Sequence, residues 1–286
     1  MSNFKKKISF YLMRTIKSKR IRDFLAQRKS RQIKKSEIPK GIGRVFDIDV
    51  NHLNEKGYLN LGSFLSSKEI QNIMDKIKTF KCYDPFRKEL GMFTSDKIPA
   101  EVHVANYRRE DLSSVSELLE IANNSDILNV VQDFLGATPT ITNINMWWSI
   151  PGKERAEQAQ LFHRDVDDLK FCKLFIYFTD VDMFNGPHVY VEGSSSSKKL
   201  REIRRYNNEE INKAFGEYSI KYFTAPKGSA FIVDTYGFHK GLLPKNKKRL
   251  LFQVQYSLSP IGIESYTPIK IENNNYNKYI NRLIIK

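Results

Sequence analysis

The chain is poor in cysteine and has no long apolar segment. Its 286 residues include two cysteines, Cys82 and Cys172, whose spacing fits neither a disulfide framework nor a zinc site. No apolar run approaches the roughly 18 residues that a membrane-spanning helix needs. The N-terminal stretch SFYLM is too short for the core of a signal peptide. We therefore expect a reduced, cytoplasmic protein without a membrane span.

Acidic residues are scarce in one region only. The chain has 47 Lys and Arg against 32 Asp and Glu, but residues 1–40 hold 14 of the basic residues and only two acids, Asp23 and Glu37. The remaining residues, 41–286, carry a net charge of only +3. Apolar residues recur at roughly helical spacing within the basic arm: Phe4, Ile8, Tyr11, Leu12, Ile16, Ile21, Phe24 and Leu25.

This basic arm, residues 1–40, allows several interpretations. A basic amphipathic helix can lie on an anionic membrane surface, here the inner face of the cell membrane, or dock on an acidic partner. Equally, a partly helical and solvated tail can pack on the body of the protein. Nucleic acid is disfavoured as a partner, because the arm has no interleaved aromatic residues and no recognition motif.

The body, residues 41–286, changes character after Pro139. A helical front over 41–137 contains a short strand near Tyr58 and Leu61, a helix that begins with the capping box of Ser66 and Glu69, and helices over 115–122 and 125–135. Residues 138–260 hold apolar, β-rich runs separated by turn residues, and 261–286 form a C-terminal extension. This order predicts a single α+β domain, a jelly-roll barrel (double-stranded β-helix) flanked by N-terminal helices.

The segment FHRDVDD places His163 two residues before Asp165. On a strand these two side chains point to the same face. A second histidine, His239, follows a β-rich run and a turn. Taken alone, each residue is more easily explained as an ordinary core or turn residue. Together they predict a site with two histidines and one carboxylate, which leaves positions open on a non-haem Fe(II); Asp167 shares the parity of Asp165 and is the fallback ligand.

Arg249 lies ten residues after His239, at the start of the apolar run LLFQVQY. Arginine is the side chain that binds a small carboxylate through two hydrogen bonds. A metal site with a buried arginine suits a co-substrate that is a 2-oxo acid, because the metal chelates the 2-oxo end and the arginine neutralises the far carboxylate.

These motifs resemble the phytanoyl-CoA dioxygenase family of Fe(II)- and 2-oxoglutarate-dependent oxygenases. The resemblance includes GYLNLGSFLSSKEI, VVQDFLG, NGPHVYVEGSSSSKK and the segment from His239 to Tyr256, and so covers roughly residues 50 to 260. It implies that Fe(II), 2-oxoglutarate and O2 are used. It also implies roles for particular residues: His163, Asp165 and His239 as iron ligands, Arg249 as the 2-oxoglutarate clamp, and Asn145 and Phe175 as lining of the cofactor pocket.

Two positions depart from the family's usual pattern, Arg164 where Gln is common and Ser195 where His is common. Neither belongs to the three expected ligands. Halogenases of the same superfamily resemble hydroxylases in which the carboxylate ligand is replaced by a small residue. Asp165 therefore favours hydroxylation, with succinate and CO2 as co-products.

The sequence does not identify the substrate, and we expect a small molecule. One alternative is a membrane- or nucleotide-linked precursor of a surface glycan or lipid, with the arm holding the enzyme at the membrane. A second alternative is a catalytically silent barrel that acts as a binding module. We expect the segments 81–109 and 194–222 to supply the lid and the substrate walls. His188 and Lys173 are weaker candidates for the pocket.

Overall fold

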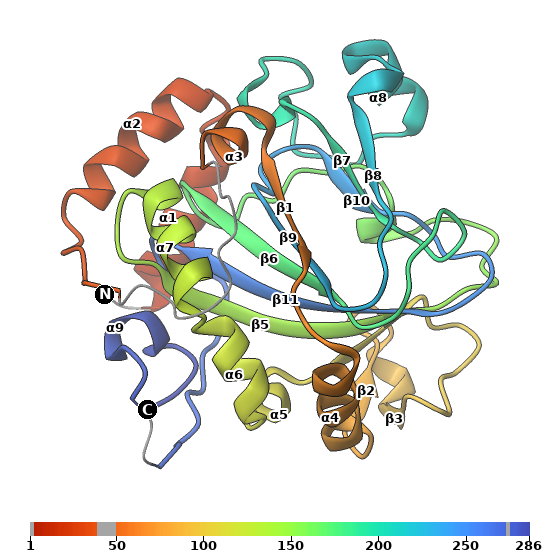
Figure 1. The fold of residues 1–286 in the computed structure, drawn as a ribbon. Coiled ribbons are helices and arrows are strands. Elements are labelled where there is room, and N and C mark those ends of the chain that lie inside the picture. Colours follow the sequence, from red (N-terminus) through yellow and green to blue (C-terminus); the bar gives the residue numbers. More distant parts are fainter. Residues whose placement is uncertain (1–2, 39–49, 273–274) are drawn as a thin grey trace.

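A computed structural model describes residues 3–38, 50–272 and 275–286 and contains two antiparallel sheets (Figure 1). The large sheet has the strand order β1-β9-β6-β11-β5-β4-β2-β3, and the small sheet has the order β10-β7-β8. The strands are β1 (Tyr58–Ser63), β2 (Lys81–Tyr83), β3 (Met92–Thr94), β4 (Val104–Tyr107), β5 (Thr140–Ser149), β6 (Phe171–Tyr177), β7 (His188–Val191), β8 (Ile220–Phe223), β9 (Ser229–Val233), β10 (His239–Gly241) and β11 (Arg249–Ser257).

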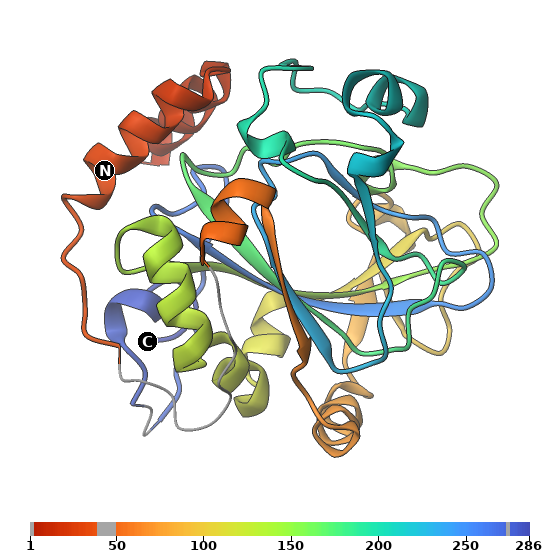
Figure 2. The same cartoon turned by 45° about the horizontal axis from the view of Figure 1, so that its top comes forward.

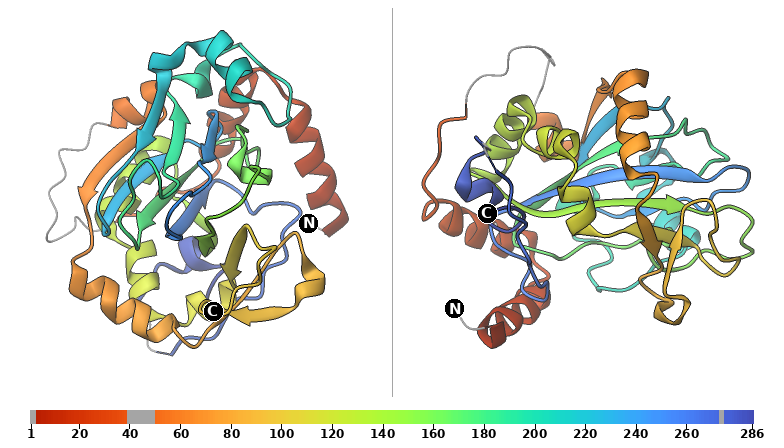
Figure 3. Two further views of the ribbon diagram at one scale, coloured as in Figure 1. Left: turned by 90° about the vertical axis from the view of Figure 1, so that its right-hand side faces the viewer. Right: turned by 90° about the horizontal axis from the view of Figure 1, so that it is seen from below.

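Helices lie around these sheets. They are α1 (Asn3–Thr15), α2 (Lys19–Ser30), α3 (Val50–Lys56), α4 (Ser67–Ile77), α5 (Arg109–Ser113), α6 (Ser116–Ala122), α7 (Ser125–Leu135), α8 (Asn208–Phe215) and α9 (Lys278–Asn281). Helices α4 to α7 cover one face of the large sheet (Figure 1 and Figure 3). None of the helices in the described residues is both long enough and apolar enough to cross a membrane.

Strand β11 shows how the sequence separates the main core from the site. Its alternate residues Leu250, Phe252, Val254 and Tyr256 are buried in the cluster that packs against the helices. The residues between them, Arg249, Leu251 and Gln253, point the other way and line a cavity. This alternation follows from the two-residue period of a strand. One strand therefore serves the core on one face and a polar cavity on the other.

The helical front contains the local signals that the sequence predicted. The side chain of Ser66 accepts a hydrogen bond from the Glu69 amide, and the Glu69 carboxylate accepts one from the Ser66 amide, which completes the capping box of α4. Helix α7 ends before Gly136, which adopts a left-handed conformation with φ of 75°. The short strands β2, β3 and β4 also lie in this region, and the sequence did not predict them.

The segment between β7 and β8 differs from its predicted role. We expected residues 194–222 to form a wall of the substrate site. Instead, α8 within this segment packs on the outer face of the small sheet, where Ile211 joins Val189 and Val191 in a separate apolar cluster (Figure 2). The other predicted segment, 81–109, does contribute cavity residues, among them Phe86 and Asn106.

The arm forms two helices, α1 and α2, rather than one continuous amphipathic helix. Phe10, Arg22 and Ala26 are buried against the body. Much of the predicted apolar stripe is exposed to solvent instead: Ile8, Tyr11, Leu12, Ile21 and Phe24. The side chain of Phe4, and residues 39–49 between the arm and the body, lie outside the described part of the chain. The arm thus packs on the body, but largely through residues other than those of the stripe.

Candidate metal and co-substrate site

His163, Asp165 and His239 converge at one end of the space between the two sheets. His163 and His239 form a single β-bridge, in which each backbone amide donates to the other residue's carbonyl at 3.0 Å. The Asp165 amide donates to the Thr235 carbonyl at 2.9 Å. His163 and Asp165 do not lie on a regular strand, because the strand pairing stops after the bridge. Both side chains nevertheless point to the same place.

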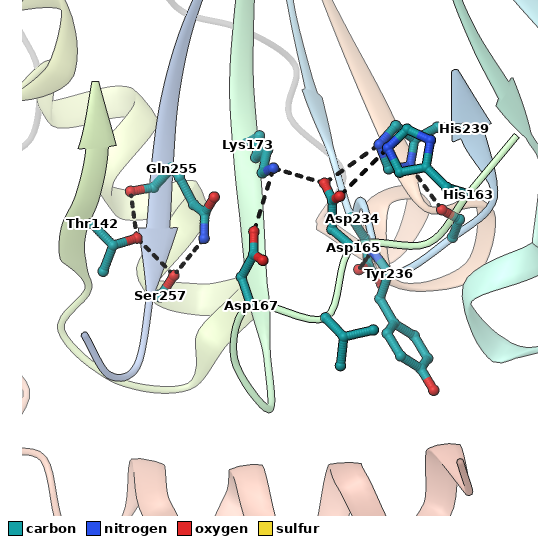
Figure 4. Close-up of polar contacts among 12 residues, drawn as sticks. Thr142, His163, Asp165, Asp167, Lys173, Asp234, Tyr236, His239, Gln255 and Ser257 are labelled. Carbon is teal, nitrogen blue, oxygen red and sulfur yellow. Dashed lines mark hydrogen bonds and ion pairs between the residues drawn. The ribbon is translucent and has the colours of Figure 1, made fainter. Parts of the chain in front are cut away.

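The two imidazole rings are fixed in the orientation that a metal ligand needs (Figure 4). Nδ1 of His163 lies 2.8 Å from the Leu161 carbonyl, and Nδ1 of His239 lies 3.0 Å from the Gly237 carbonyl. A carbonyl can only accept, so each Nδ1 carries the hydrogen and each Nε2 is the ring nitrogen that can bind a metal. These Nε2 atoms face Asp165 at 3.5 Å and 3.4 Å.

One donor atom from each of these three residues lies within 4.8 Å of the other two. Burial lowers the pKa of His163 to about 3, with a further contribution from the neighbouring His239, so this ring is neutral at neutral pH. Burial alone would raise the pKa of Asp165, but the Lys173 ammonium and His239 outweigh it and hold it well below its usual range. Two imidazoles and one carboxylate could hold a divalent metal ion.

Lys173 connects Asp165 to the second carboxylate of the loop. Its ammonium lies 2.7 Å from Asp165 and 3.6 Å from Asp167 (Figure 4). Asp167 does not belong to the cluster of metal-binding donors, so the geometry favours Asp165 over the fallback ligand. The sequence placed Lys173 on a strand with Phe175, but its pairing with Asp165 was not predicted.

A cavity of about 250 Å³ opens beside the three donors. Three neighbouring strands of the large sheet contribute alternate residues to its wall. These are Asn145, Trp147 and Ser149 of β5, Lys173 and Phe175 of β6, and Arg249, Leu251 and Gln253 of β11. All six residues that the resemblance assigned to the site therefore meet at one cavity. Trp147, Gln253 and Ser149 were missed, although the period of two on either side of Asn145 and Arg249 would have found them.

Arg249 is 2% exposed and forms no ion pair with a carboxylate in the described residues. Its two Nη atoms donate to the Gly186 carbonyl and, at 2.8 Å, to the Ser149 hydroxyl. Gly186 has a φ of 75°, and a Cβ there would lie 2.4 Å from the Leu242 carbonyl oxygen, so only glycine fits this turn. Nε of Arg249 has no hydrogen-bond partner within the described residues. A buried cation without an anion is costly, which suggests that a bound ligand supplies the anion.

His188 and Gln160 add two further unpaired donors to the cavity wall. His188 lies on β7 with its ring 4.9 Å from that of Phe175 and 5.6 Å from that of His239. Nε2 of His188 and Nε2 of Gln160 are both buried and have no hydrogen-bond partner in the described part of the chain. By contrast, Arg164 does not line the cavity: it donates to the carbonyls of Tyr236 and Ser194, at 2.6 Å and 2.9 Å.

Comparisons with solved structures agree with this fold. HygX from Streptomyces hygroscopicus, crystallised with nickel, 2-oxoglutarate and hygromycin B, matches with a TM-score of 0.55 and 14% identity over 80% of this chain and 92% of its own. SnoK, a non-haem α-ketoglutarate-dependent carbocyclase of nogalamycin biosynthesis, matches with a TM-score of 0.54 and 17% identity over 76% and 86%. AviO1 from Streptomyces viridochromogenes Tue57 matches with a TM-score of 0.51 and 15% identity over 72% and 92%. The predicted jelly-roll architecture is confirmed.

The sequence itself matches a family model. No curated protein matches this sequence. The model described as phytanoyl-CoA dioxygenase, however, matches residues 53–247, which include every residue discussed for the site except Arg249, Leu251 and Gln253. This family uses Fe(II), 2-oxoglutarate and O2. The chain therefore belongs to the phytanoyl-CoA dioxygenase family of non-haem iron, 2-oxoglutarate-dependent oxygenases.

Proposed function

We propose that this protein is a hydroxylase that oxidises a C–H bond of a small molecule and releases succinate and CO2. One observation carries the proposal. The cavity that holds the two inward-facing histidines and Asp165 also holds a buried arginine without an anion. A site of this kind can bind a metal ion through the three side chains and a dicarboxylate co-substrate through the arginine.

Each residue has a separate task in this proposal. His163, Asp165 and His239 hold Fe(II), and Arg249 binds the far carboxylate of 2-oxoglutarate. When bound, the iron and its co-substrate supply the oxidising power of the reaction. Lys173 keeps Asp165 ionised through their 2.7 Å contact. Phe175 and Leu251 form an apolar wall that excludes water from the bound co-substrate.

Three further lining residues suggest how a substrate is held. Phe86, Trp147 and Gln160 all line the cavity, and Phe86 is half exposed at its edge. The Glu157 amide donates to Gln160 Oε1 at 2.9 Å, which leaves the Gln160 Nε2 group free to donate to a substrate oxygen. A small molecule with an oxygen acceptor near the oxidised carbon fits these three residues. The structural neighbour HygX was crystallised with a small molecule, hygromycin B.

The test compares two carboxylates of the same loop. Purified protein would be incubated with Fe(II), ascorbate and 2-oxoglutarate, and succinate would be measured. Asp165→Asn should abolish metal-dependent succinate formation, because it removes the only carboxylate among the three donors. Asp167→Asn is the matched control and should keep most of the activity. Full activity in Asp165→Asn, or loss in Asp167→Asn alone, would refute the ligand assignment. A wild-type protein that binds 2-oxoglutarate but never forms succinate would favour the binding-module alternative.

We also propose that the enzyme works in the cytoplasm and contacts an anionic membrane surface through its arm. Both cysteines are free and buried, which suits a reducing compartment. The arm exposes apolar side chains, with Tyr11 and Leu12 each 61% exposed and Phe24 64% exposed. Basic residues surround them and complement the charge of anionic lipids.

Vesicle sedimentation tests this location. Wild-type protein should sediment with vesicles of phosphatidylglycerol and phosphatidylcholine but not with phosphatidylcholine alone, and added salt should weaken binding. Leu12→Ser together with Phe24→Ser should reduce binding strongly. Tyr218→Ser is the matched control, because Tyr218 is 96% exposed and lies outside the arm. Equal sedimentation of the arm variant and the control would refute the membrane contact.

A further inference from the structure

Arg22 of helix α2 is the most deeply buried charged residue of the arm. It is 1% exposed, and it forms no ion pair with a carboxylate in the described residues. A guanidinium in such a place must be satisfied by other polar groups, because burial of an uncompensated charge is strongly unfavourable. Its contacts therefore show what the arm is attached to.

These contacts lead to the loop that follows the metal-site aspartate. One Nη atom of Arg22 donates to the carbonyls of Asp168 and, at 3.4 Å, of Leu169. The other Nη atom donates to the Met13 carbonyl of α1 at 3.3 Å. Arg14 of α1 donates to the Val166 carbonyl at 3.4 Å. The arm thus binds three carbonyls within the four residues that come directly after Asp165.

A stack of rings and guanidinium groups joins Arg22 to the ligands themselves. The Arg22 guanidinium lies 4.4 Å from the centre of the Tyr236 ring. Arg164, which stands between His163 and Asp165, lies 5.3 Å from the same ring and 3.9 Å from the ring of Phe238. Phe238 directly precedes His239. In Figure 4 Tyr236 points away from the metal-binding side chains, towards helices drawn in the faint red of the arm.

The loop needs such an anchor, because it is not packed tightly on either side. The Asp165 side chain lines the site cavity, while Asp167 and Asp168 line a second cavity of about 490 Å³ between the loop and the arm. Interior packing without voids is what usually fixes a side chain in place. Here hydrogen bonds to backbone carbonyls must do so, and those from Arg22 and Arg14 come from a segment outside the matched family domain, which starts at residue 53.

We propose that Arg22 is a positioning residue for the metal site: from the side opposite the site cavity, the N-terminal arm holds the loop that orients Asp165. The inference rests on the proposed metal site. In this proposal the position of the ligand Asp165 depends on helix α2, which lies outside the matched family domain. Mutation of the residues that hold and orient a metal's ligands typically changes metal affinity by 10- to 100-fold.

The experiment uses the full-length protein and two readouts. Mn(II) alone would be titrated by calorimetry, and hydrogen exchange of residues 161–170 would be followed by mass spectrometry without metal. Arg22→Met should weaken Mn(II) binding by roughly tenfold and speed exchange in this segment. Arg22→Lys should restore little, because an ammonium cannot reproduce the planar fork. Arg20→Met is the matched control: it removes an exposed arginine from the same helix and should change neither readout.

The two readouts separate the ways in which the inference can fail. Unchanged exchange in Arg22→Met would show that the arm does not hold the loop. Faster exchange with unchanged Mn(II) affinity would reduce Arg22 to a merely structural residue and overturn the proposal. Wild-type protein that bound no Mn(II) would refute the proposed metal site, and exchange would still report on the anchor. If Arg22→Met does not fold, Arg14→Met removes the contact to Val166, together with a ring contact to Phe10 of its own helix, and should give the same two changes at smaller size.

Discussion

Two buried arginines, Arg249 and Arg22, lie on opposite sides of the loop that carries Asp165. They are 2% and 1% exposed, and neither forms an ion pair with a carboxylate in the described residues. Both have an Nε without a hydrogen-bond partner there. The exposed fraction, the lack of a carboxylate partner and the unpaired Nε therefore do not distinguish the two side chains.

They differ in what covers the guanidinium. Arg249 faces a cavity, and one of the two groups that it binds, the Ser149 hydroxyl, also lines that cavity. The Arg22 guanidinium is covered by the ring of Tyr236, and the Nη atoms of Arg22 donate to backbone carbonyls. A buried cation that faces open space is arranged for an anionic ligand, whereas one enclosed by an aromatic face and carbonyls holds the fold together. The partners of a buried charge, rather than its burial, indicate its role.

The largest expected effect tests the cavity side of this comparison. Arg249→Met should weaken 2-oxoglutarate binding to Mn(II)-loaded protein by about 2 to 5 kcal/mol, which is roughly 30-fold to several thousandfold, because the far carboxylate of the co-substrate loses the buried cation that pairs with it. Mn(II) affinity itself should change little, since Arg249 does not contact the three donors. Calorimetric titration of metal and then of 2-oxoglutarate separates the two.

The exposed Lys247 gives the matched control for this variant. Lys247→Met removes a cation two residues away from Arg249, and it should leave both affinities within about twofold, as surface changes usually do. Equal loss of 2-oxoglutarate binding in both variants would indicate a general electrostatic effect and not a clamp. Unchanged binding in Arg249→Met would remove the arginine from the site.

The cavity side could be predicted from the sequence much better than the arm side. His163, Asp165, His239 and Arg249 sit in short motifs whose spacing and turns are visible locally, and all four meet at the cavity. Helix α7 has the predicted bounds, because an Asn-Ser start and the final Gly136 are local signals. Where a few residues contain the whole signal, the prediction holds.

Features that depend on distant contacts were missed. Strands β2, β3 and β10 have three residues each, too few for a periodic pattern to show. Arg22 contacts residues 146 and 147 positions away, and nothing near it in the sequence indicates a partner. The arm's apolar spacing predicted one amphipathic surface, but burial selected Phe10 and Ala26 and left Leu12 exposed. Tertiary contacts decide which side of such a helix is covered.

The second prediction concerns a carboxyl group on the arm side of the loop. Burial raises the pKa of Asp168 from 3.8 to about 6, even though the amides of Leu169 and Ser259 donate to its carboxylate. The folded protein therefore keeps this proton to higher pH than the unfolded chain. The contribution of Asp168 to the free energy of unfolding should therefore fall by about 3 kcal/mol in total as the pH rises from about 4 through about 6. Above that pH it should stay constant.

Urea unfolding of wild type and Asp168→Asn checks this sign. The asparagine cannot ionise, so the stability of the variant relative to wild type should increase by about 3 kcal/mol between about pH 4 and pH 7. Other titrating groups cancel in the difference. A difference that stayed constant with pH would show that Asp168 is ionised at its ordinary pKa. An ordinary pKa at this buried position would require a counter-ion, and Arg22 would have to supply it to the Asp168 carboxylate. Arg22 would then no longer differ from Arg249 as an arginine held by carbonyls and a ring.

The smallest effect is expected for Tyr236, whose ring lies between Arg22 of the arm and Arg164 of the metal-site loop. Tyr236→Leu removes the aromatic face that contacts both Arg22 and Arg164, and it should lower the free energy of unfolding by about 1 to 2 kcal/mol, the size of a desolvated cation–π contact. Tyr236→Phe keeps the face and should match wild type. Mn(II) affinity should fall by less than in Arg22→Met, since the carbonyl contacts remain, and 2-oxoglutarate affinity of the metal-loaded protein should not change. If Tyr236→Leu weakened 2-oxoglutarate binding as much as Arg249→Met does, the two sides of the loop would act as one site, and the separation drawn between the arginines would fail.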